Sequence, residues 1–310
     1  MKILLTGGAG YLGNIVTRKL LDQKHEVVII DNLIHGSSGC TGLFQIQLND
    51  NSCLIKDDIK NIKKYDNHFQ DVDIVFHFAA PRLQHIHSSK EIDDSLEDLK
   101  VLYDLSVKHK VKKFVFPSSC SVYGYRDKIV NEKDDVNITS YYAELKHKSE
   151  LLLEDYNEIN TILARQATLF GVSNLMRNDL MINNFVKSVK EKKEFEVYGK
   201  DTWRPNLDVS DCANILLKLV EKEFSGLINV GTDSLNLSKQ DIIDEIPKAI
   251  GIDISKYVNY ESSNGRTDWP PSHDSRSYKV AFTKLKDLIG GKFIDLNKGI
   301  RRLYERNRTI

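Results

Sequence analysis

The glycine-rich turn near the N-terminus constrains the fold more than any other feature of this chain. Residues 2–6 (KILLT) form a short apolar run typical of a buried strand, and Gly7, Gly10 and Gly13 follow it closely. Apolar residues then recur at helical spacing up to about Gln23. Glycine at these three positions permits a tight turn, a close approach of the backbone to a pyrophosphate, and close packing of helix on strand. The pattern predicts the first strand–helix unit of a dinucleotide-binding domain.

A second predicted strand, residues 26–31 (EVVIID), ends in an acidic residue that bears on the choice of cofactor. Asp31 lies 18 residues past Gly13. At this position a carboxylate accepts hydrogen bonds from the adenosine ribose and repels a 2′-phosphate. The strand, turn, helix, second strand and acid therefore predict a site for NAD rather than NADP.

Strand-like and helix-like segments alternate further along the chain. We expect two more strands that end near residues 58 and 80, strands at 111–116, 160–164 and 226–231, and helices near 95–109, 141–157 and 211–223. This alternation predicts an α/β fold, a Rossmann doubly wound parallel sheet with a smaller C-terminal substrate-binding lobe. We expect residues 1–170 to form the NAD-binding domain, with 207–232 returning to it, and 171–206 and 233–310 to form the lobe.

Composition limits the partners that the chain can have. Lysine plus arginine and aspartate plus glutamate both number 44, so no net charge attracts nucleic acid or an anionic membrane. No apolar run reaches transmembrane length, and a first strand at residue 2 leaves no room for a signal peptide. The four cysteines lack metal-ligand spacing. We expect a cytoplasmic protein with no metal site and no nucleic-acid or membrane partner.

Tyr142 and Lys146 form the second informative pattern. Four residues apart in a predicted helix, they share one face, which places the ammonium of Lys146 beneath the phenol of Tyr142. A free tyrosine, with a pKa near ~10, is a poor base at neutral pH, and a neighbouring cation lowers that pKa. Ser119, shortly after a predicted strand, is placed to hold a substrate hydroxyl in line. The three residues are candidates for a base, the cation that tunes it and an orienting hydroxyl.

On these motifs the chain resembles the extended short-chain dehydrogenase/reductases, specifically the NAD-dependent nucleotide-sugar epimerase/dehydratase family and its UDP-glucose 4-epimerases. The likeness runs from Met1 to about Lys279 and covers the glycine turn, both strand-end acids and the Tyr-x-x-x-Lys pair. By this resemblance the residues that bind the cofactor are Gly7, Gly10, Tyr11, Leu12, Gly13, Asp31, Asn32, Asp58, Ile59, Phe78, Ala79, Ala80, Arg82, Tyr142 and Lys146.

The second half of the chain resembles the nucleotide-sugar region of the same family. By this likeness Arg204 and Arg266 bind the diphosphate, whose oxygens match the paired donors of a guanidinium. Arg177 is a third candidate of this kind, and Thr168 stands where the family has a substrate-contacting asparagine. Together with Ser119, these are the expected substrate-binding residues.

Two departures from the family pattern concern the reaction and the cofactor pocket. The dehydratases carry Asp-Glu directly after the catalytic hydroxyl, where this chain has Cys120 and Ser121. Elimination of water therefore lacks its acid. The Asn-Val-x-Gly-Thr signature of the helix after the fourth strand is also absent, and residues 95–99 read SLEDL instead.

We therefore expect an NAD-dependent epimerase that oxidises a ring hydroxyl of a nucleotide-diphosphate sugar at C4, through a keto intermediate, and then returns the hydride. Two alternatives stay open. One is a 4-dehydrogenase or ketoreductase of the same family, and the other is a non-catalytic NAD-binding sensor on the same fold. The resemblance also implies a homodimer formed through the helices near 95–109 and 141–157.

Overall fold

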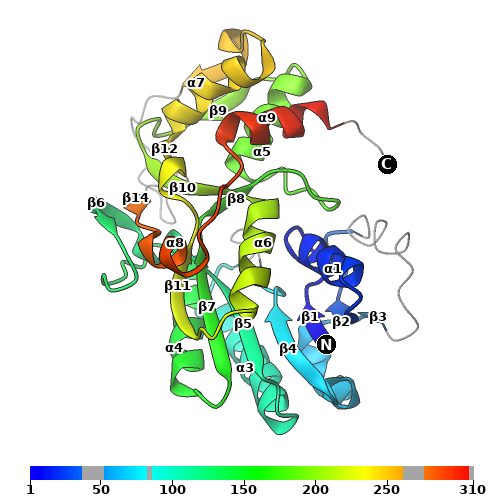
Figure 1. The fold of residues 1–310 in the computed structure, drawn as a ribbon. Helices are drawn as coiled ribbons and strands as arrows, with labels where there is room; N and C mark the ends of the chain where they lie inside the picture. The colour runs from blue at the N-terminus through cyan, green and yellow to red at the C-terminus, as the bar shows by residue number, and fades with distance from the viewer. Residues whose placement is uncertain (37–51, 82–85, 261–275, 307–310) are drawn as a thin grey trace.

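A seven-stranded parallel sheet forms the centre of the computed structural model, which describes residues 1–36, 52–81, 86–260 and 276–306 (Figure 1). Its strands are β1 (Lys2–Thr6), β2 (Glu26–Asp31), β3 (Cys53–Lys56), β4 (Val72–His77), β5 (Lys113–Ser119), β7 (Asn160–Gln166) and β11 (Gly226–Val230). They lie in the order β11-β7-β5-β4-β1-β2-β3. The order reverses at β1, between β4 and β2, and sheets of this kind bind their ligands at such a switch point.

Helices cover both faces of the sheet, because successive strand residues point to opposite sides and both sides are apolar. Ile3 and Leu5 of β1 pack in one buried cluster with α1 (Gly13–Asp22) and α6 (Val209–Val220). Leu4 packs in another cluster with α3 (Ser89–Lys108) and α4 (Tyr141–Asp155). The predicted Rossmann doubly wound α/β fold is confirmed.

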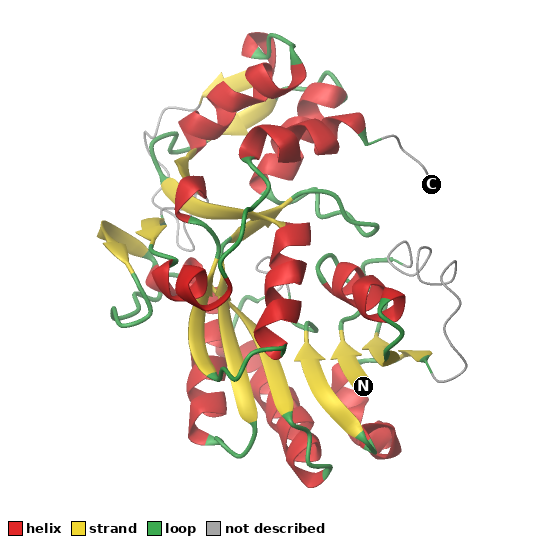
Figure 2. Cartoon of the chain, in the orientation of Figure 1, coloured by secondary structure: helices red, strands yellow, loops and turns green. Residues whose placement is uncertain are grey.

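A second group of elements has an apolar cluster of its own and lies above the sheet in Figure 2. Its helices are α5 (Met181–Lys190), α7 (Lys239–Ile250) and α9 (Leu296–Glu305). Its short strands are β8 (Thr168–Phe170), β9 (Phe195–Val197), β10 (Trp203–Asp208), β12 (Asn236–Ser238) and β13 (Val258–Tyr260). β10 pairs with β8 and β12, and β9 pairs with β13. Ile246 and Ile300, both 0% exposed, lie in the core of this group.

The remaining elements are short and lie beside the sheet. Two strands, β6 (Tyr125–Val130) and β14 (Ser277–Val280), form a parallel ribbon. α8 (Thr283–Ile289) contacts α6 and β11. The 3₁₀ segments are η1 (Ile59–Phe69), η3 (Cys120–Tyr123), η4 (Asp233–Leu235) and η5 (Ser255–Tyr257).

The predicted strands and helices are present, and tertiary contacts shift some of their ends. β5 continues to Ser119 rather than ending at Phe116, because its last residues pair with β7 as far as Gln166. α3 begins at Ser89 rather than near residue 95. The extension of β5 carries the Ser119 side chain to the carboxyl edge of the sheet, where the candidate site lies.

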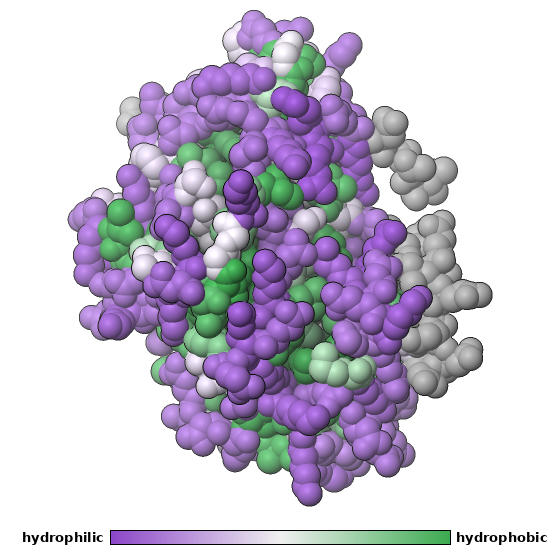
Figure 3. Space-filling model, in the orientation of Figure 1, coloured by the Kyte–Doolittle hydropathy of each residue, from purple (hydrophilic) through white to green (hydrophobic). Residues whose placement is uncertain are grey.

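No helix in the described part of the chain combines the length and the apolar composition that a membrane span needs. Figure 3 shows hydrophilic residues over most of one face. Residues 1–36, 52–81, 86–260 and 276–306 contain no group of His, Cys, Asp and Glu arranged to hold a metal ion.

Candidate active site

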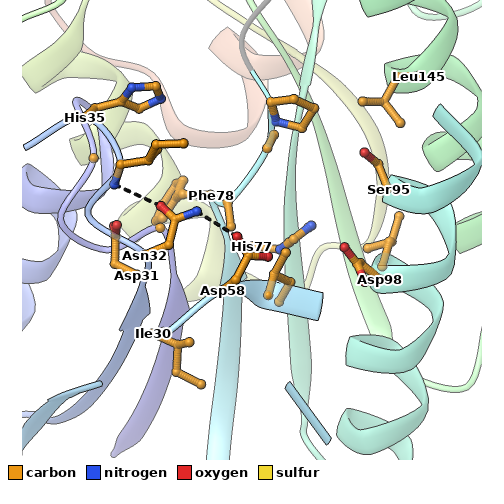
Figure 4. Close-up of a pocket in the computed structure, with 18 of the residues that line it drawn as sticks. Ile30, Asp31, Asn32, His35, Asp58, His77, Phe78, Ser95, Asp98 and Leu145 are labelled. Carbon is orange, nitrogen blue, oxygen red and sulfur yellow. Dashed lines mark hydrogen bonds between the residues drawn. The ribbon is translucent and has the colours of Figure 1, made fainter. Parts of the chain in front are cut away.

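A cavity of about 600 Å³ lies at the carboxyl ends of the central strands. Its walls come from the loops after β1, β2, β3 and β4 and from α3 and α4 (Figure 4). Of the predicted cofactor residues, those that line it are Gly7, Gly10, Asp31, Asn32, Asp58, Ile59, Phe78, Ala79, Ala80 and Lys146. Tyr11, Leu12, Gly13 and Tyr142 are not among the lining residues, and Arg82 lies outside the described residues.

The glycine turn is shaped by close backbone contacts that admit no side chain. A Cβ atom on Gly7, whose φ is +70°, would lie 2.5 Å from the amide nitrogen of Ala79. A Cβ atom on Gly13 would lie 2.1 Å from the carbonyl oxygen of Gly7. No side chain caps the N-terminus of α1, which begins at Gly13. Such an end offers amide donors and a partial positive charge to a pyrophosphate, so the turn fits the dinucleotide predicted from the sequence.

The loops after β2 and β3 form the part of the cavity wall next to the glycine turn. Asp31 Oδ2 accepts a hydrogen bond from the Ala9 amide (2.9 Å) and its Oδ1 accepts one from the Leu33 amide (2.8 Å). Asn32 Nδ2 donates to Asp58 Oδ2 (2.9 Å), as Figure 4 shows. Each carboxylate oxygen keeps a further lone pair for a ligand. The acid thus ties the glycine turn to β2 and still fits an adenosine ribose.

Two elements, β5 and α4, bring Ser119, Tyr142 and Lys146 together at the end of β5. Ser119 caps η3, its Oγ accepting from the Ser121 amide (3.1 Å), and its hydroxyl interacts with the Tyr142 phenol. Tyr142 lies in the first turn of α4, which Ser140 caps by accepting from the Ala143 amide. One turn later, Lys146 Nζ donates to the carbonyl oxygen of Pro117 in β5 (2.7 Å). The three residues that the sequence spacing singled out therefore lie together in one compact group beside the cavity.

Burial dominates the electrostatics of this group. It raises the pKa of Tyr142, while the charge of Arg177, the hydrogen bond with Ser119 and the charge of Arg276 act in the opposite direction. Burial lowers the pKa of Lys146 to about 8, against the attraction of Glu150. From its spacing to Lys146, Tyr142 is expected to have a lowered pKa, but in the folded chain the net shift of its pKa is upward.

The position of the Lys146 ammonium explains this difference. Its Nζ lies 5.9 Å from the centre of the Tyr142 ring and only 4.6 Å from the centre of the Phe116 ring, and its hydrogen bond goes to Pro117. Arg276 was not among the predicted site residues. The sequence feature that could have indicated it is its position directly before β14, whose residues alternate between partly buried and buried.

The predicted substrate residues are spread along the segment that leads into the second group of elements. Thr168, in β8, pairs with Asn206 of β10. Arg204, in β10, is 5% exposed, and its guanidinium lies 5.2 Å from the centre of the Tyr278 ring. Arg177 forms an ion pair with Asp179 (2.5 Å), and Arg266 lies outside the described residues.

Asp98 is a feature of the cavity that the sequence analysis did not single out. It lies on α3, within the SLEDL segment that replaces the family signature, and faces the cavity wall that carries Asp58 (Figure 4). Burial raises the pKa of its carboxyl to about 6, followed by repulsion from Asp58, Glu97 and Asp94. The ionised form of Asp98 is therefore disfavoured in the folded chain.

We expect Asp98→Asn to stabilise the fold above pH 6 and to have little effect below pH 4. An acid whose pKa is raised on folding lowers the free energy of unfolding. The full loss applies once the pH exceeds the pKa of the acid in the folded state, and it disappears as the pH falls below the pKa in the unfolded state. After allowance for its partial exposure, the gain is about 1 kcal/mol, or about 2 °C in Tm, at pH 8. Thermal unfolding at pH 4 and pH 8 measures this. Asp93→Asn, an exposed change on the same helix, is the control, and equal shifts for both variants would contradict the assignment.

Comparison with known proteins places the chain in a family. Residues 3–231 match the model of the NAD dependent epimerase/dehydratase family. A UDP-glucose 4-epimerase of Bacillus subtilis is 28% identical over 265 residues, which cover 76% of this chain and 77% of that protein.

Two solved structures share the fold over nearly their whole length. A UDP-glucuronic acid 4-epimerase from Bacillus cereus, in complex with UDP-glucuronic acid and NAD, has a TM-score of 0.85 and 25% identity, with 98% of both chains covered. A dTDP-glucose 4,6-dehydratase from Streptomyces venezuelae has a TM-score of 0.84 at 20% identity, with 98% of this chain and 96% of that chain covered, and that likeness shows the fold. The chain therefore belongs to the NAD-dependent epimerase/dehydratase family and is an NAD-dependent enzyme of the extended short-chain dehydrogenase/reductase class.

Proposed function

We propose that this enzyme is a nucleotide-sugar 4-epimerase. The observation that carries the proposal is the group formed by Ser119, Tyr142 and Lys146 beside the cofactor cavity. A base next to an orienting hydroxyl suits removal of a proton from a sugar alcohol. The relatives named as UDP-glucose and UDP-glucuronic acid 4-epimerases make UDP-sugars the first substrates to test.

In this proposal each catalytic residue has one task at a stated atom. Ser119 Oγ hydrogen-bonds with the C4 oxygen of the sugar, and the Tyr142 phenolate takes the C4 hydroxyl proton. The charges of Arg177 and Arg276 favour that phenolate. Lys146 would hold the nicotinamide ribose with its Nζ, which Pro117 already orients. NAD, when bound, accepts a hydride from C4 and returns it.

The reverse half of the reaction uses the same groups. The 4-keto sugar would present its other face to the nicotinamide side of the site, and Tyr142 would give its proton back to the C4 oxygen. The balance is an inverted C4 centre with no net oxidation. Loss of water is disfavoured here because Cys120 replaces the acid of the dehydratases, is 1% exposed and donates to the Arg165 carbonyl (3.2 Å). Burial raises the pKa of its thiol, so the group stays protonated and inert.

We assign the predicted cofactor residues to NAD binding and the second group of elements to substrate binding. Residues 1–170 and 207–232 form the NAD-binding domain, and 171–206 with 233–310 form the nucleotide-sugar lobe. The substrate is bound by Thr168, Arg177, Arg204 and Arg266.

We also propose a cytoplasmic homodimer formed through α3 and α4. Leu151 of α4 is exposed and available to such an interface, whereas Leu153 is buried within the chain.

The test is incubation of the purified enzyme with a panel of UDP-, GDP-, dTDP- and CDP-sugars. We expect a C4 epimer of one of them, with no net change in the 340 nm absorbance of reduced cofactor. A ketone that accumulates with reduced cofactor would instead make the enzyme a 4-dehydrogenase. Absence of any product, with bound NAD that no sugar nucleotide reduces, would contradict both and favour an NAD-binding sensor.

A further inference from the structure

The side chain of Tyr11 leaves the glycine turn and enters the substrate segment. Tyr11 is 7% exposed, and its hydroxyl donates to the carbonyl oxygen of Gly171 (2.8 Å), 160 residues away in sequence. Asn183, in the first turn of α5, donates to the same hydroxyl through Nδ2 (3.2 Å). A residue of the cofactor turn is thus hydrogen-bonded directly to the chain that follows β8.

Asn183 extends this contact to Arg177. Its Oδ1 accepts from the Gly171 amide (2.9 Å), and its Nδ2 also donates to the carbonyl oxygen of Arg177 (3.0 Å). Asn183 is 2% exposed, so both ends of its amide are used inside the protein. Because a buried network of this kind has one fully bonded arrangement, it fixes the course of the backbone between Gly171 and Asn183.

A second pair of bonds fastens the same segment to the glycine turn. Ser173 Oγ donates to the carbonyl oxygen of Tyr11 (2.7 Å). Asn14, in the first turn of α1, donates through Nδ2 to Ser173 Oγ (2.7 Å) and to the carbonyl oxygen of Gly10 (2.6 Å). Ser173 and Asn14 are both buried. The segment 171–183 is therefore held by the cofactor turn at two points.

The segment carries a charge that reaches the catalytic group. Arg177 lies within it and favours the ionised form of the Tyr142 phenol, and it acts in the same direction on the Tyr11 phenol. Burial nevertheless raises the pKa of Tyr11, which stays a protonated hydrogen-bond donor. A shift of the segment would move Arg177 relative to Tyr142.

We propose that Tyr11 is a positioning residue, whose hydroxyl, through Gly171 and Asn183, holds the segment 171–183 and with it Arg177 in place for the substrate. The cofactor turn and the substrate segment then form one hydrogen-bonded unit. The part of the inference that concerns substrate rests on the proposed function, and the part that concerns the segment does not.

Tyr11→Phe tests the inference, because it removes one hydroxyl and keeps the ring and the backbone amide. Tyr103→Phe is the matched control: Tyr103 is 0% exposed and its hydroxyl also makes two hydrogen bonds, to Tyr156 and from Ile159, both outside the segment 171–183. Amide hydrogen exchange of residues 171–183 is the first readout. We expect exchange about tenfold faster in Tyr11→Phe and unchanged in Tyr103→Phe. Equal exchange rates in the two variants would overturn the inference, whatever the enzyme's substrate.

Kinetics with the sugar nucleotide identified in the panel are the second readout. We expect KM to rise by about three- to tenfold in Tyr11→Phe, more than kcat falls, and bound NAD to be retained. In an Arg177→Gln background the same change should add little to KM, since the group that it positions is gone. Equal and additive KM increments in the two backgrounds would show that Tyr11 acts independently of Arg177. Lack of any turnover by the wild type would contradict the proposed function and leave the exchange result to decide the inference.

Discussion

We expect Tyr142→Phe to lower kcat by about a thousandfold, because it removes the phenol that is the proposed base of the reaction. The substitution removes one oxygen from a ring whose position is fixed by helix α4 and leaves Lys146 bonded to Pro117. Steady-state turnover of the sugar nucleotide measures the loss. Thermal unfolding should show little change, because the ring stays packed and the Ser119 hydroxyl keeps its bond from the Ser121 amide.

Tyr141→Phe is the control for this prediction, since Tyr141 precedes Tyr142 in the same helix and is 38% exposed. We expect its turnover to match that of the wild type. Turnover of Tyr142→Phe within tenfold of the wild type would rule the phenol out as the base. It would direct attention to another proton acceptor in the site.

Arg165→Met is expected to cost about 3–5 kcal/mol of folding free energy, because it leaves a buried carboxylate without its cation. Arg165, in β7, donates to both carboxylate oxygens of Glu150, at 3.0 and 2.7 Å. Its third nitrogen donates to Tyr123 (3.1 Å), and Ser118 also donates to Glu150. Arg165 and Glu150 are both buried, so solvent does not replace the lost partner. Urea unfolding at pH 7 measures the cost.

The pH dependence of this loss has a defined sign. Burial alone would raise the pKa of Glu150, but the bonds from His147 and Arg165 and the charge of Arg165 outweigh it, and the net direction is downward. A carboxyl whose pKa is lowered on folding stabilises the fold when the pH is above its unfolded-state pKa. That stability is lost as the pH falls through its folded-state pKa. The difference between wild type and Arg165→Met should therefore shrink toward pH 4. The double variant Arg165→Met/Glu150→Gln should be more stable than the single one at pH 7, and a single-variant cost below about 1 kcal/mol would contradict the prediction.

Local sequence rules predicted the elements whose causes are local. The glycine turn was recognisable because Gly7, Gly10 and Gly13 serve backbone geometry within one strand–turn–helix unit. Tyr142 and Lys146 were recognisable because a helix places residues four apart on one face. Asp31 was recognisable because a strand end carries it to the cofactor side of the sheet.

The features that were missed depend on residues far apart in sequence. The raised pKa of Asp98 comes from burial and from Asp58, which another element brings to the same cavity. The influence of Arg276 on Tyr142 depends on the ribbon of β6 and β14, and the hydrophobic periodicity of the sequence did not predict that ribbon. The pKa direction predicted for Tyr142 was wrong because spacing along a helix shows which groups are near but not how far water is excluded from them.

The topology of the sheet also determines when its strands can pair during synthesis. β11 pairs along β7, from Gly226 opposite Ile162 to Val230 opposite Gln166, and residues 167–225 separate the two strands. During synthesis on the ribosome, β7 therefore presents a free edge of apolar residues until residue 230 has emerged. Exposed edges of this kind are sites of mispairing between chains. β11 replaces β7 as the edge strand of the sheet, and it is shorter than β7. Truncation before β11 would leave the longer apolar edge of β7 exposed, and we expect it to yield aggregation rather than a smaller soluble domain.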